Sequence, residues 1–146
     1  MRDGLSTLLA ALDSAPAPVR FFVRDDDAGW DDERLLALLD VVDAATVPID
    51  LALIPMAVAS PLAAELRGRH DAAPQRLGLH QHGLAHTNHE SEGRKCEFGP
   101  ARGTDAQRQD LQRGRQRLGS LFGSRLDPIF TPPWNRCGET TPALLH

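Results

Sequence analysis

The sequence predicts an α/β fold with a parallel sheet of about four or five strands and flanking helices. Short β-rich runs alternate with longer amphipathic runs, which is typical of strand–helix–strand units. Several predicted strands end in polar clusters, as strands of α/β enzymes do where they enter active-site loops. The 146 residues correspond to one domain, which we expect to extend over residues 1–146.

The composition excludes several functional classes. Apolar residues make up 41% and charged residues 25%, as in ordinary globular proteins. The net charge of −4 argues against nucleic acid or an anionic membrane as a partner, because both require a basic face. No apolar run approaches the roughly 20 residues of a membrane span. The two cysteines have no metal-ligand spacing and do not suggest a disulfide scaffold.

The first elements are a helix and a strand. Residues 5–13 predict an amphipathic helix that ends before Pro16, and Asp13 makes a secretory signal the less favoured reading. A cytoplasmic location is therefore predicted, with secretion left open. Residues 19–24 predict a buried strand. Three successive carboxylates, residues 25–27, are expected to form its exit loop because they do not suit a buried strand.

The later elements continue the alternation. Asp31 or Asp32 is expected to cap a helix that extends to about Ala45, and Ser60 to cap the next helix with Pro61 in its first turn. The remaining predictions are a helix from 60 to about 69, strands at 48–54, 76–80 and 126–130, a surface loop at 90–103, a helix from 104 or 105 to 122, and the start of a helix at 142.

Three polar clusters follow predicted strands. They are the aspartates at 25–27, the histidine-rich stretch at 79–90 and the Pro-Pro-Trp-Asn segment at 132–135. Because the carboxyl ends of parallel strands meet at one edge of a sheet, we expect the three clusters to lie together.

The residue types in these clusters suit a catalytic metal site. His82 and His86 share a face if their segment is helical or tightly looped, and one aspartate would complete a two-histidine, one-carboxylate ligand set. A second aspartate beside it would serve as a general base. Each cluster also has a simpler interpretation: a solvated polar loop for the histidines, anions at a helix N-terminus for the aspartates, and a rigid turn with a core aromatic for residues 132–134.

The three clusters resemble the motifs of a known family. Asp26-Asp27, His82-Gly83-Leu84-Ala85-His86 and Phe130-Thr131-Pro132-Pro133-Trp134 are similar, in order and spacing, to the first three motifs of polysaccharide deacetylases, the NodB-like carbohydrate esterases. The resemblance covers roughly residues 19–137. It implies a partial (β/α) barrel of the NodB-like deacetylase type, because the motifs that follow in the family have no counterpart. The chain is thus predicted to be a deacetylase domain lacking its C-terminal part.

The resemblance also implies roles. It implies removal of an N- or O-linked acetyl group from a carbohydrate by metal-activated water, with an aspartate as general base. It implies that Asp26 is the catalytic base. It implies that a divalent metal, predicted to be zinc, is bound by Asp27, His82 and His86. Contacts with the substrate and the oxyanion are implied for Pro133 and Trp134.

Departures from the family pattern lead to further expectations. Thr131 stands where the family has an arginine that orients the base, and Arg24 or Arg136 would substitute for it. By strand alternation, His80 shares a face with His82 and would support the site. His89 and Glu90 are assigned to the following loop.

Two alternative functions stay open. One is an inactive remnant that binds metal or a glycan, because the family's general acid has no counterpart. The other is a metal-dependent amidase acting on a non-sugar amide. Whether this chain is an enzyme, formally a hydrolase of C–N bonds other than peptide bonds, is therefore left open. The expected partner is an acetylated carbohydrate, and a homo-oligomer would close the sheet edge left open at the first or fourth strand.

Overall fold

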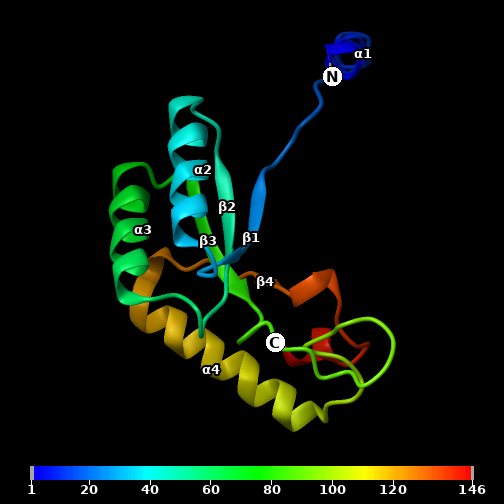
Figure 1. Cartoon of the computed structure of the whole chain (residues 1–146), viewed down its shortest axis with the longest axis vertical. Helices are drawn as coiled ribbons and strands as arrows, with labels where there is room; N and C mark the ends of the chain where they lie inside the picture. Colours follow the sequence, from blue (N-terminus) through cyan, green and yellow to red (C-terminus); the bar gives the residue numbers. More distant parts are fainter. Residues whose placement is uncertain (1, 146) are drawn as a thin grey trace.

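Four parallel strands form one sheet that curls into a half-barrel in this computed structural model, which describes residues 2–145 (Figure 1). The end residues of the predicted domain, Met1 and His146, lie outside the described part. The strand order is β1-β2-β3-β4, so β1 and β4 form the edges. The strands are β1 (Arg24–Ala28), β2 (Ile49–Leu53), β3 (Leu77–His82) and β4 (Phe130–Thr131). The predicted α/β partial barrel is thereby confirmed.

Three of the helices cover the sheet. Figure 1 shows α2 and α3 side by side on one flank, with α4 running across the lower end of the sheet. Leucines of α2 and α3 are buried against β2 and β3, and Leu118 and Phe122 of α4 join the same core. The helix α1 lies apart, joined by an extended segment. The helices are α1 (Arg2–Asp13), α2 (Asp32–Ala44), α3 (Ser60–Ala72) and α4 (Thr104–Phe122), followed by short 3₁₀ turns at Gly123–Arg125, Pro133–Asn135 and Thr141–Leu144.

The starts of α2 and α3 differ in how they are capped. The Asp31 side chain accepts a hydrogen bond from the Arg34 N–H at 3.1 Å, as an N-cap residue should. Ser60 is already the first helical residue of α3, and the cap position is held by Ala59 without a side-chain hydrogen bond. The prediction of an aspartate cap is confirmed for Asp31, whereas the prediction of a Ser60 cap is wrong.

The position predicted for the first strand is also wrong. Strand β1 begins at Arg24 and contains the aspartates that were expected to form its exit loop. Phe21 and Phe22, expected to be buried, are 72% and 78% exposed. The aspartates fit within the strand because β1 is an edge strand and their carboxylates stay partly accessible instead of entering the apolar core.

The segment at 90–103 is only partly the expected surface loop. Residues 96–99 in it are buried. Phe98 packs edge-to-face on Phe130 of β4, with ring centroids 5.2 Å apart, and forms a backbone bridge to Cys137. The loop thus contributes core contacts beyond the edge of the sheet. Within residues 2–145, no helix is both long and apolar enough to cross a membrane.

Candidate active site

A local irregularity in β1 directs two neighbouring aspartates to the same side. Side chains of a regular strand alternate between faces, so Asp26 and Asp27 would be expected to point apart. The pairing of β1 with β2 shifts register between Asp25 and Ala28, and Asp27 has a positive φ of 65°. A bulge of this kind re-aims a side chain. As a result, both Asp26 and Asp27 line one cavity.

A tight turn after β3 brings the two histidines together. His82 is the last residue of β3, Gly83 has a φ of 60° and His86 has a φ of 55°. A Cβ at Gly83 would lie 2.0 Å from Glu97 Oε2 and 2.5 Å from Pro133 Cγ, so only glycine fits there. The rings of His82 and His86 are 5.2 Å apart between centroids. Of the two arrangements left open for this segment, helical or tightly looped, the structure has the tight loop.

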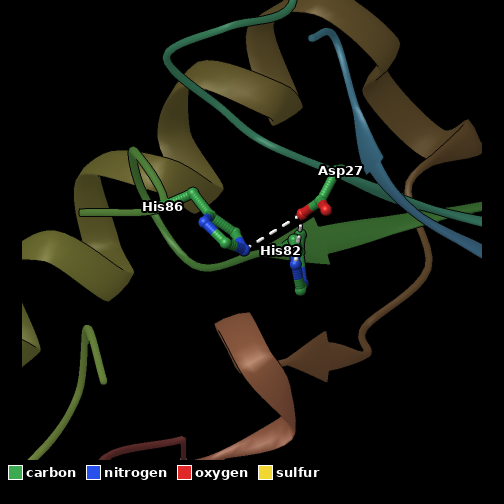
Figure 2. Close-up of side chains that lie close together, drawn as sticks. All are labelled: Asp27, His82 and His86. Carbon is green, nitrogen blue, oxygen red and sulfur yellow. Dashed lines mark hydrogen bonds and ion pairs between the residues drawn. The ribbon is translucent and has the colours of Figure 1, made fainter. Parts of the chain in front are cut away.

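Asp27, His82 and His86 form a candidate metal site. Oδ1 of Asp27 lies 3.2 Å from His82 Nε2 and 3.0 Å from His86 Nε2 (Figure 2). The three potential ligand atoms all lie within 4.8 Å of one another. The histidine side chains are only 1% and 4% exposed, whereas the Asp27 side chain is 40% exposed and faces the cavity. Three N/O ligands with an open side are the arrangement typical of a catalytic metal.

The hydrogen bonding of His82 fits a bound cation. Its Nδ1 lies 3.0 Å from the Thr131 carbonyl oxygen, which can only accept, so Nδ1 carries a proton. Burial lowers the pKa of His82 and favours the neutral ring. The neutral ring then directs the Nε2 lone pair at the Asp27 carboxylate, an acceptor facing an acceptor. Both groups are suitable ligands for a divalent cation, which would remove this mismatch, so these residues fit a metal.

A buried carboxylate holds the turn that carries His86. Glu97 is 1% exposed and accepts backbone N–H bonds from Leu84, Ala85 and Thr87, at 3.2, 2.9 and 3.4 Å. These donors would otherwise be unpaired, and leaving a buried donor unpaired costs about 1–3 kcal/mol. Sequence reasoning missed Glu97, because nothing in a polar loop sequence shows that one of its acids folds inward.

Arg24 fixes the orientation of Asp26. Its guanidinium donates to both oxygens of Asp26, at 2.7 and 3.1 Å, and also to Asn135 Oδ1 at 2.9 Å. Arg136, the other arginine considered for this position, instead donates to the carbonyl oxygen of Lys95 at 3.3 Å. Of the two arginines suggested by the sequence, Arg24 is therefore the one that contacts Asp26. Asn135 was not assigned to the site, although it directly follows the third motif.

Thr131 supports both histidines of β3. Its hydroxyl lies 2.9 Å from His80 Nε2, and its carbonyl oxygen accepts from His82. His80 is 2% exposed and does not line the cavity, and burial lowers its pKa. His80 thus contacts Thr131, whose carbonyl oxygen contacts His82, and its supporting role stays a prediction. His89 lies outside the cavity, 3.3 Å from the guanidinium of Arg102, as its assignment to the loop implied.

These residues border a cavity of about 520 Å³ at the carboxyl ends of the strands. Both tryptophans of the chain pack on His86, with ring centroids 4.5 Å away for Trp30 and 4.1 Å for Trp134. Trp134 therefore lies where a substrate contact was expected, whereas Pro133 is buried beside Gly83 and does not line the cavity. The lining residues are Asp26, Asp27, Trp30, His82, His86, Asn88, Lys95, Trp134 and Asn135.

Comparison with known proteins supports the fold. No protein-family model and no curated protein matches the sequence. The solved structure of a family 4 acetyl xylan esterase from Clostridium thermocellum in complex with a cobalt ion has a similar fold, with a TM-score of 0.63 and 17% sequence identity. The match covers 82% of this chain and 51% of the esterase chain, so this chain spans about half the length of that structure. The predicted fold likeness to a NodB-like carbohydrate esterase is confirmed.

Proposed function

We propose that this protein removes an acetyl group from a carbohydrate in a reaction that depends on a divalent metal. The proposal rests on the presence of a candidate metal site and a candidate general base in the same cavity. Asp27, His82 and His86 point their donor atoms at a common centre, and Asp26 beside them is held by Arg24. The fold likeness to an acetyl xylan esterase solved with cobalt supports the substrate class and the metal.

The residues divide the chemistry between them. When bound, a divalent ion, for which we propose zinc, would activate a water molecule and polarise the acetyl carbonyl. The Asp26 carboxylate accepts the proton of the attacking water. Arg24, which also donates to Asn135, keeps that carboxylate directed at the cavity. The backbone N–H near Trp134 stabilises the oxyanion, and the Trp134 ring forms a wall of the acyl or sugar pocket.

Two measurements on purified protein test the proposal. We expect about one divalent ion per chain, retained by the wild type and by Asp26→Asn but lost from Asp27→Ala. We expect steady release of acetate from an acetylated xylo-oligosaccharide or an N-acetylated sugar, which Asp26→Asn lowers by at least about 100-fold. Asp25→Asn is the matched control, because Asp25 belongs to the same strand but does not line the cavity.

The outcomes separate the alternatives. A stoichiometric ion without any acetate release would indicate an inactive metal-binding protein. Hydrolysis of simple amides in preference to acetylated sugars would indicate an amidase. If the wild type bound no ion, and Asp27→Ala left the metal content unchanged, the proposal would be wrong.

A further inference from the structure

We infer that Lys95 forms a subsite for a negatively charged group, so that the preferred substrate is an acetylated sugar carrying a carboxylate or phosphate. This inference rests on the proposed function, since it concerns the substrate of the same cavity. Lys95 is the only lysine in the sequence, and it borders the cavity that contains the candidate metal site. No role was assigned to it from the sequence.

The ammonium group of Lys95 forms no ion pair within the described part of the chain. Seven arginines form ion pairs with carboxylates, but Lys95 has no carboxylate within 4.0 Å among the described residues. The nearby acid Glu97 accepts from backbone N–H groups, and Glu90 accepts from the Ala101 N–H. The ammonium group is therefore free to bind an anion that enters the cavity.

The backbone around Lys95 is held at the cavity rim. The Lys95 carbonyl oxygen accepts from Arg136 Nη1 at 3.3 Å, and the next residue, Cys96, donates its N–H to Asn88 Oδ1 at 2.9 Å. Asn88 itself lines the cavity. These contacts tie the lysine to both the histidine turn and the segment after Trp134. A lysine whose backbone is held on two sides is a better recognition group than one on a free loop, because less backbone ordering accompanies binding.

The charge balance of the cavity favours an anionic substrate. Asp26 is neutralised by Arg24, and Asp27 belongs to the candidate metal site. With a divalent ion in place, the charged groups lining the cavity would be net positive, with Lys95 unpaired. Such a cavity attracts anions and rejects additional cations. The guanidinium of Arg136, which contacts the Lys95 carbonyl, adds to this potential.

The cavity also offers surfaces for a sugar ring next to this cation. Trp30 is 56% exposed, and its contact with His86 is edge-to-face. A volume of about 520 Å³ lies within the range of about 300–1,000 Å³ that is typical of small-molecule sites. A sugar ring would contact the tryptophans, its acetyl group would face Asp26 and Asp27, and its acidic group would meet Lys95.

Matched substrates that differ only in charge test the inference. O-acetylated galacturonic acid is compared with its methyl ester, and N-acetylglucosamine 6-phosphate with N-acetylglucosamine, which separates carboxylate from phosphate recognition. For the wild type we expect kcat/KM to favour at least one acidic member by about tenfold or more, through KM. Added salt should reduce this preference. In Lys95→Gln the ratio of kcat/KM for the acidic substrate to kcat/KM for the neutral one should fall towards one. Lys95→Arg should largely restore this ratio.

A control and a second readout keep the outcomes distinct. Arg94→Gln removes an adjacent exposed cation that does not line the cavity, and should leave the ratio unchanged. Binding of the acidic compounds to metal-loaded protein is followed by tryptophan fluorescence, which does not require turnover. Equal acetate release from acidic and neutral substrates would overturn the subsite but leave the proposed function intact. If the wild type bound the acidic compounds more tightly than Lys95→Gln did, but released no acetate, the result would support the subsite and contradict the proposed function.

Discussion

The two halves of the candidate site are supported in different ways. In the metal half, the His82 and His86 side chains are only 1% and 4% exposed, although Asp27 is 40% exposed. The Thr131 carbonyl oxygen contacts His82, and the buried Glu97 carboxylate holds the turn that carries His86. In the base half, the Arg24 and Asp26 side chains are 29% and 27% exposed. The Arg24 side chain donates to the Asp26 carboxylate, and Asn135 accepts a second hydrogen bond from the same guanidinium.

This difference gives a physical reason why the chain resembles the deacetylase motifs at the histidine turn and departs from them at Thr131. The histidine turn requires Gly83 and the buried acceptor Glu97, so its geometry tolerates few alternatives. The base needs only a cation within reach, and a cation can come from any neighbouring element. Here the expected arginine position is occupied by Thr131, and the guanidinium comes from the first residue of β1 instead.

Removing the buried acceptor should have the largest effect on the metal half. We expect Glu97→Ala to raise the Kd for a divalent ion by about 10- to 100-fold, because the turn carrying His86 loses three hydrogen bonds to the carboxylate. Glu97→Gln should be milder, since it keeps one carbonyl oxygen. Titration calorimetry measures both variants. Glu92→Ala, in the exposed part of the same loop, should match the wild type, and an unchanged Kd in Glu97→Ala would contradict a supporting role.

Removing the cation should affect the base half alone. We expect Arg24→Gln to lower the rate of acetate release by about 10- to 100-fold, the usual cost of a misplaced catalytic group, with little change in metal Kd. Arg24→Lys should retain part of the rate. The exposed Arg20 provides the control substitution, Arg20→Gln. A loss of metal together with activity in Arg24→Gln would show that the two halves are not separable.

A smaller effect is expected at Thr131. Thr131→Val removes the hydroxyl that meets His80 Nε2 and leaves this buried nitrogen unpaired, at a cost of about 1–3 kcal/mol in unfolding free energy. Because His82 contacts the backbone carbonyl of residue 131, the Kd for metal should change by less than about threefold. Chemical unfolding and metal titration check both statements. A large loss of metal affinity would show that the hydroxyl also orients His82.

The smallest effect is a pH dependence of the metal-free protein. Burial lowers the pKa of His80 and His82 in the folded chain below their ordinary value of 6.5. Between the folded and unfolded pKa values the unfolded chain binds more protons, so stability is highest above pH 6.5 and falls as the pH decreases. We therefore expect Tm, measured by thermal unfolding, to fall as the pH is lowered below 6.5. His89→Gln should show the same profile, and a constant Tm would contradict the burial argument.

The motifs and their order could be predicted from the sequence, but the neighbouring segments less well. Asp26, Asp27, His82 and His86 were singled out by residue type and spacing, and Trp134 by the family resemblance; all five line the cavity. Pro133 was expected there as well, but it lies buried. Spacing along the chain indicates which elements carry a residue, whereas it does not show which side chain turns inward.

What the sequence determined by itself is the alternation of elements and the gathering of polar clusters at one sheet edge. Hydrophobic periodicity and turn residues are local properties, and parallel topology then brings strand ends together. The tertiary structure alone decided that a bulge turns Asp26 and Asp27 to the same side, and that Glu97 and Lys95 meet the site. These positions depend on backbone irregularities and on long-range contacts, which leave no periodic signal in the chain.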